Sequence, residues 1–101
     1  MNKLDDIKLT LKKMIFLLRA ENYEGWVETL EAINLDSNQS LKSISKDILS
    51  IYGGAGSVND IVFYKEGQSL TDKNNEFDEL RTHLYELCKM FINEGIQYKT
   101  P

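Results

Sequence analysis

Apolar side chains recur at alternating steps of three and four residues in four segments of the 101-residue chain. This spacing is the period of an amphipathic helix with one buried face. The first segment carries its apolar stripe at Leu4, Ile7, Leu11, Met14 and Leu18. The fourth segment is equally regular, with a stripe at Phe77, Leu80, Leu84, Leu87 and Phe91. Both patterns predict helices of several turns.

Two shorter stripes lie between these segments. The second stripe consists of Trp26, Leu30 and Ile33. The third consists of Leu41, Ile44, Ile48 and Ile51. Because each helix offers one apolar face, we expect the four helices to share one core. The predicted fold is mainly α, a compact four-helix bundle-like single domain over residues 1–101.

Polar residues between the stripes predict where two of the helices begin. The third helix is expected to be capped by Asp36, Ser37 or Asn38. The fourth helix is expected to be capped by Asn74 or Asn75 and to end near Gly95. Residues 65–73 look like an exposed loop. Residues 61–64 fit either a short strand or a helical turn, and residues 68–71 offer them a partner for a small hairpin.

A glycine-rich loop separates the third and fourth helices. Its characteristic string is Tyr52-Gly53-Gly54-Ala55-Gly56-Ser57-Val58-Asn59-Asp60. A phosphate loop needs a lysine after its glycines, whereas this loop ends in Asn59 and Asp60, which disfavours an anion. A reversal of the chain direction explains the glycines of this loop better than phosphate binding does. Gly53 suits a left-handed cap on a helix ending at Tyr52, and Gly54 and Gly56 allow tight turns.

The polar end of the same loop predicts local capping. Ser57 followed three residues later by Asp60 resembles a capping box, and Asn59 suits a bond from its side chain to the backbone. We therefore interpret the loop as a structural scaffold, and a contact of the loop with a partner stays an alternative.

Composition and charge narrow the function classes. The net charge of −4 and the absence of a clustered basic field disfavour nucleic acid and favour a basic partner. No apolar run approaches the roughly 20 residues that cross a bilayer, so we expect no membrane association. A single cysteine permits no internal disulfide and suits a reducing compartment. These features predict a cytoplasmic protein.

His83 and Cys88 are the residues best suited to nucleophilic chemistry. At about 100° per residue, their five-residue spacing separates them by roughly 140° around a helix, which excludes a dyad. Glu79 and Glu86 lie at helical spacing from His83, but one helix cannot complete a metal coordination shell. We therefore predict no catalytic residues, no metal, no cofactor and no enzymatic activity.

A run of carboxylates accompanies the second apolar stripe, at Glu21, Glu24, Glu28 and Glu31. On one helix these four residues share one face opposite the apolar side. Such a face is either simply solvated or a docking strip for a basic surface. Under the second interpretation, exposed aromatic side chains at Tyr23 and Tyr64 are expected to anchor the partner.

The glycine-rich string resembles the signature Tyr-Gly-Gly-x-Gly-Ser-x-Asn-Asp of a family of small bacterial domains. The helix around Trp26 and the helix over residues 77–87 agree with the same family. Ala55 stands where the family often has a bulky residue such as methionine, and Val58 where it has an aromatic one. The family is also similar to immunity proteins that protect bacteria from toxins of competing cells.

The resemblance implies a small, stand-alone cytosolic protein that binds the toxic C-terminal domain of a secreted or surface-delivered toxin. A basic nuclease is one candidate for that domain. No catalytic residue transfers with the resemblance. The alternative is a regulatory or adaptor protein without a toxin partner, including one that works as a homodimer. Under the immunity hypothesis, the toxin is expected to contact the carboxylates and the two tyrosines named above: Glu21, Glu24, Glu28, Glu31, Tyr23 and Tyr64.

Overall fold

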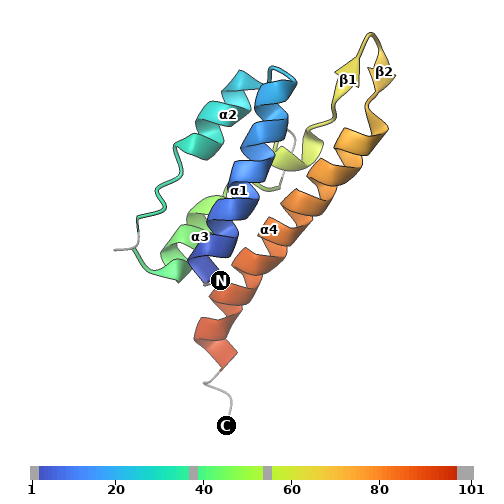
Figure 1. Cartoon of the computed structure of the whole chain (residues 1–101). Helices are drawn as coiled ribbons and strands as arrows, with labels where there is room; N and C mark the ends of the chain where they lie inside the picture. The colour runs from blue at the N-terminus through green and yellow to red at the C-terminus, as the bar shows by residue number, and fades with distance from the viewer. Residues whose placement is uncertain (1–2, 37–38, 54–55, 98–101) are drawn as a thin grey trace.

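The computed structural model describes residues 3–36, 39–53 and 56–97. The α-helices in this part of the chain are α1 (Lys3–Ala20), α2 (Glu24–Glu31), α3 (Leu41–Leu49) and α4 (Thr71–Gln97). A short 3-10 helix, η1 (Val58–Asp60), and a hairpin of β1 (Tyr64–Lys65) and β2 (Gln68–Ser69) lie between α3 and α4 (Figure 1). The predicted mainly helical fold is confirmed, as is a small hairpin before the fourth helix. No helix in the described ranges is long and apolar enough to cross a membrane.

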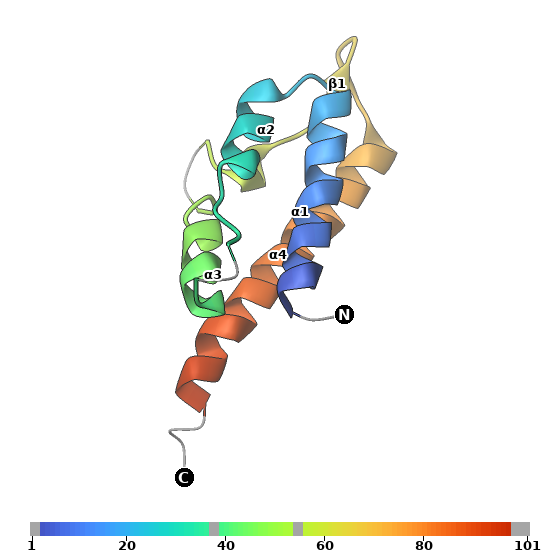
Figure 2. The same ribbon diagram turned by 60° about the vertical axis from the view of Figure 1, so that its left-hand side comes forward.

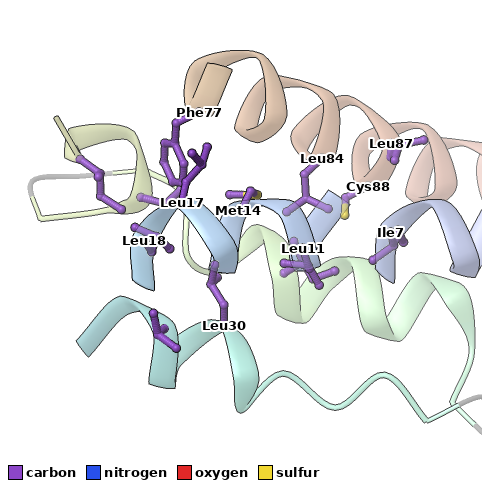
Figure 3. Packing of buried hydrophobic residues seen from close by; sticks show 14 of the residues in the cluster. Ile7, Leu11, Met14, Leu17, Leu18, Leu30, Phe77, Leu84, Leu87 and Cys88 are labelled. Carbon is purple, nitrogen blue, oxygen red and sulfur yellow. The ribbon is translucent and has the colours of Figure 1, made fainter. Parts of the chain in front are cut away.

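Helix α1 occupies the centre of the fold. It packs against both α2 and α4, and α3 packs against the C-terminal half of α4 (Figures 1 and 2). Side chains from α1, α2 and α4 converge on one core (Figure 3). The fully buried members of the predicted α1 stripe include Ile7, Met14 and Leu18. The helical spacing read from the sequence therefore identified the faces that the helices bury.

The predicted helix starts were less accurate. Helix α3 is capped by Ser40, whose Oγ accepts a hydrogen bond from the Ser43 backbone N at 3.0 Å. Asp36 lies too far before the helix to cap it. The other two predicted caps, Ser37 and Asn38, lie outside the described residues.

Helix α4 also departs from its predicted limits. It begins at Thr71 instead of after Asn74 or Asn75, and it continues past Gly95 to Gln97. Asn74 does not cap the helix because its side-chain amide binds a neighbouring segment instead. The region predicted as a loop over residues 65–73 is thus a hairpin followed by the first turn of α4.

The hairpin is closed by a two-residue turn at Glu66 and Gly67. Both residues have a positive φ, 53° and 79°, which is the backbone of a type I′ turn. Tyr64 pairs with Ser69, and Lys65 pairs with Gln68, in antiparallel register. Residues 61–64 were predicted to be either a strand or a helical turn. Residues 61–63 are neither, because η1 ends at Asp60 and strand pairing begins only at Tyr64.

Candidate partner-binding surface

The glycines of the characteristic string are required for their backbone conformation. Gly53 has a φ of +88° and Gly56 a φ of +77°, and a Cβ atom at either position would meet nothing within 4 Å. A left-handed φ, and not lack of space, therefore favours glycine at both positions. The helix itself ends earlier than predicted, at Leu49, and i to i+3 turns continue to Tyr52. Gly54 lies outside the described residues.

The polar residues of the string cap η1. Ser57 Oγ accepts a hydrogen bond from the Asn59 backbone N at 3.2 Å. Asp60 Oδ2 accepts one from the Gly56 backbone N at 2.6 Å. This reciprocal pattern resembles the predicted capping box, but it closes a single 3-10 turn, and Asp60 reaches one residue further back than in the standard motif. Asn59 takes part through its backbone, and its side chain lines a hollow beside α4.

Arg81 of α4 fastens the string to the helix bundle. Its Nη1 donates hydrogen bonds to the carbonyl oxygens of Val58 and Ile61, both at 3.1 Å. Its Nη2 forms an ion pair with Asp78 at 2.9 Å. In return, the Tyr52 hydroxyl donates to the Arg81 carbonyl oxygen at 2.6 Å. Burial raises the pKa of Tyr52 well above its usual range, so this hydroxyl stays a donor.

Asn74 provides a second attachment point. Its side-chain Oδ1 accepts from the Phe63 backbone N at 2.7 Å, and its Nδ2 donates to the Phe63 carbonyl oxygen at 3.1 Å. The Phe63 ring is fully buried between the rings of Tyr23 and Phe77, with centroids 5.3 Å from each. Sequence analysis did not single out Arg81 and assigned Asn74 to helix capping, because neither residue stands near the string in the chain.

The four predicted docking carboxylates do not form one strip. Glu21 precedes α2 in a turn, its side chain is only 14% exposed, and it pairs with Lys73. Glu31 pairs with Arg19 at 3.0 Å. The remaining two, Glu24 and Glu28, are exposed on α2. The prediction that all four share one helix face is therefore wrong for Glu21.

The two predicted aromatic anchors also differ from each other. Tyr23 is half-buried, and its hydroxyl donates to the Val62 carbonyl oxygen at 2.8 Å. With its ring against Phe63, Tyr23 joins α2 to the segment before β1 and is not a free anchor. Tyr64 is 60% exposed.

The exposed side of α2 and the residues next to it form a surface that we call the α2 face. It consists of Glu24, Gly25, Trp26, Glu28 and Thr29 of α2, with Val62 and Tyr64 beside it. On an ideal helix, Trp26 lies roughly 160° from Glu28, with Gly25 and Thr29 between them. Two neighbouring hollows that share Tyr23, Trp26 and Gly56 mark its aromatic edge. The segment from η1 to β1 runs past α2 at this edge (Figure 2).

The geometry of the α2 face suits a protein partner. One edge is acidic, the other is aromatic, and the small residues between them permit close approach. Residues 19–71 match a family model described as a domain of unknown function (DUF6966). The chain belongs to this family. No curated protein and no solved structure shows significant similarity to it.

The DUF6966 match begins at the second-to-last residue of α1 and ends at the first residue of α4. It therefore includes the whole α2 face, the glycine-rich string and the hairpin. Arg81 and Asn74, which attach the string and the hairpin base to α4, lie beyond the match. In this DUF6966 protein, the string and the hairpin base of the matched region are therefore attached by side chains of α4, which lies almost wholly beyond the match.

His83 and Cys88 of this DUF6966 protein lie in different surroundings. Cys88 is fully buried, and burial raises the pKa of its thiol to about 11, which suppresses the reactive thiolate at neutral pH. The Ser45 hydroxyl beside the Cys88 thiol lowers the thiol pKa and so offsets part of the effect of burial. Ser45 Oγ is itself buried and has no hydrogen-bond partner of good geometry among the described residues. His83 Nε2 lies 3.3 Å from Asp6 Oδ1 on α1. Across residues 3–36, 39–53 and 56–97, no cluster of three potential metal ligands is found.

Proposed function

We propose that this protein is an immunity protein that binds and neutralises the toxic domain of a bacterial toxin through the α2 face. The observation that carries the proposal is the combination of two exposed carboxylates, Glu24 and Glu28, which have no ion-pair partner among the described residues, with the exposed aromatic Tyr64 on one surface. The resemblance of the glycine-rich string to a family similar to immunity proteins supports the same proposal.

Electrostatics supports a basic toxin domain as the partner. The chain has a net charge of −4, and the free carboxylates lie at the edge of the α2 face. A surface of this sign steers a positively charged partner during encounter and raises the association rate. A nuclease fits this requirement, because its substrate path must attract phosphates. Carboxylates docked over that path would exclude nucleic acid by charge and by volume.

Rigidity supports the same surface. The base of the hairpin is held by Asn74 and the string by Arg81, while Tyr23 joins the segment before β1 to α2. The contact residues are therefore presented by a preorganised scaffold, which lowers the entropy lost on binding. Trp26 and Tyr64 supply aromatic contact area, the type of side chain that contributes most at protein interfaces.

Gly25 offers a direct test of this surface. A Cβ atom at Gly25 would meet nothing within 4 Å, and its backbone is helical, so a larger side chain extends into solvent without disturbing the fold. Gly25→Trp should block a partner that approaches the α2 face. Gly25→Ala is the matched control, since it adds only a methyl group and favours the helix by about 0.5–1 kcal/mol.

The assay is protection of a susceptible bacterium that expresses the toxin domain encoded by the adjoining gene. Wild type and Gly25→Ala should restore growth, and Gly25→Trp should not, although circular dichroism shows all three folded. Full protection by Gly25→Trp would remove the α2 face from the mechanism. Lack of protection by the wild type, or an adjoining gene without a toxin domain, would favour the regulatory or adaptor role instead.

A further inference from the structure

An apolar groove shares no lining residue with the two hollows beside Trp26. It runs between α1 and residues 30–35, and its apolar lining comprises Leu11, Ile15, Phe16, Leu30, Ile33 and Leu35. Phe16 is 73% exposed, more than any other large hydrophobic side chain of the described residues. An exposed phenylalanine beside an apolar hollow is a costly surface in water and marks a site that another surface covers.

The two rims of this groove carry opposite charges. Lys8, Lys12 and Arg19 line the α1 side, and all three are exposed. Helix α1 as a whole contains five basic and two acidic residues, a net charge of +3 in a chain of net charge −4. The α2 side is acidic. Glu31 lines the groove and is paired there with Arg19, and the exposed Glu24 and Glu28 lie beside the groove, within about 60° of arc from Glu31 on an ideal helix.

We infer that the groove is the interface of a two-fold symmetric homodimer, with α1 of each copy lying against α2 of its partner. In such an interface, each surface must complement itself, because every contact occurs twice with the roles exchanged. This groove meets that condition. It holds a projecting ring, Phe16, together with an apolar hollow, and its basic rim on α1 lies across from the exposed carboxylates of α2.

The charge pattern decides between a second copy and another kind of occupant. A groove rimmed by lysines alone would fit an acidic helix of a different protein and would repel its own copy. Here the two-fold arrangement brings Lys8 and Lys12 of one copy to the acidic side of α2 in the other. It also buries both copies of Phe16. The inference does not rest on the proposed function, although Glu24 and Glu28 border both surfaces, so a toxin and a second copy compete for α2.

Sedimentation equilibrium over a range of concentrations tests the dimer. The wild type should self-associate, and Phe16→Asp should raise the dimer dissociation constant by about a thousandfold, since each of two buried interfacial rings contributes about thirtyfold. Met90→Asp is the matched control, because Met90 is 45% exposed on α4 and lies outside the groove. Its dissociation constant should equal that of the wild type.

A mixing experiment tests the arrangement of the rims. Apart from the Arg19–Glu31 ion pair, Lys8→Glu with Lys12→Glu makes both sides acidic, and Glu24→Lys with Glu28→Lys makes both basic. Neither double variant should self-associate, because like-charged rims then face each other. A mixture of the two should form a one-to-one heterodimer whose affinity falls as salt is added.

Three results would overturn the inference: a wild type that stays monomeric up to about 0.5 mM, a Phe16→Asp variant that associates like the wild type, or a mixture that forms no heterodimer. Phe16→Asp leaves the residues of the α2 face unchanged. Loss of self-association with retained protection against the toxin therefore separates this interface from the proposed function, and loss of protection by Gly25→Trp tests the proposed function alone.

Discussion

Replacing Arg81 with methionine removes the guanidinium that attaches the glycine-rich string to α4. Methionine keeps the unbranched stem and helix propensity of arginine but donates no hydrogen bond. The carbonyl oxygens of Val58 and Ile61 then lose the donor that now lies 3.1 Å from each. The contact of the guanidinium with the Phe77 ring, at 5.6 Å from its centroid, is lost as well.

The expected cost follows from these contacts. Hydrogen bonds from a charged donor contribute about 1.5 kcal/mol each, so the two carbonyls account for about 3 kcal/mol. The cation–π contact adds about 0.5 kcal/mol. The ion pair adds less than about 1 kcal/mol, because the side chain of Asp78 is 62% exposed and solvent screens the pair. Because methionine recovers part of the packing, we expect a net loss of about 3 kcal/mol, which lowers Tm by roughly 12–24 °C.

Urea denaturation followed by far-ultraviolet circular dichroism measures this loss. Asp78→Asn is the matched variant, since it removes the ion pair and leaves both carbonyl contacts, and it should cost less than about 1 kcal/mol. Arg81→Lys should fall between the two, because one ammonium group lacks the fork that serves two carbonyls. If Arg81→Met costs less than about 1 kcal/mol, or Asp78→Asn costs as much as Arg81→Met, the carbonyl contacts do not hold the string.

Three further predictions concern the hairpin attachment, the acidic edge and the buried thiol. Asn74→Ala should lower the free energy of unfolding by about 2 kcal/mol, because it leaves the Phe63 backbone N without an acceptor, although the Phe63 carbonyl oxygen keeps its bond from Leu70 N. The exposed neighbour substitution Asn75→Ala should change it by less than about 0.5 kcal/mol in the same denaturation assay. Glu24→Lys with Glu28→Lys should slow association with a basic toxin domain about tenfold at low salt, measured by stopped flow, and an unchanged rate would show that the edge is only solvated. Burial raises the pKa of Cys88 from 9.0 to about 11, so the thiol of the unfolded chain ionises at a lower pH than that of the folded chain. The free energy of unfolding should therefore fall between pH 9 and pH 11 more steeply in the wild type than in Cys88→Ala. Parallel pH profiles of the two proteins would contradict this.

The sequence was most informative where the structure is local. The stripes of α1 and α4 predicted the buried faces correctly because side chains three and four residues apart always share a side of a helix. The left-handed glycines and the hairpin turn are local for the same reason, since φ is a property of single residues. The predicted caps failed because several polar residues near each start compete for the role. Ser40 and not Asp36 is in position for α3, and Asn74 is taken up by Phe63.

The candidate site shows the same division. Exposure of Tyr64 and the carboxylates of α2 followed from their place in the pattern. The half-buried state of Tyr23 did not, because its partner, the Val62 carbonyl, is 39 residues away in the chain. Glu21 was assigned to the helix because its spacing fits, but the chain turns at Asn22, with a φ of 66°, and sends Glu21 to Lys73.

Residue type and spacing by themselves determined a helical domain with an acidic second helix and a glycine-rich chain reversal. Tertiary structure alone decided what the characteristic string does, because Arg81 and Asn74 meet it only after α4 has packed across the bundle. It also decided which carboxylates of the predicted strip are paired, since the partners of Glu21 and Glu31 lie elsewhere in the chain. The physical reason is that ion pairs and hydrogen bonds act over a few ångströms in space, and periodicity along a chain carries no information about which distant residues come that close.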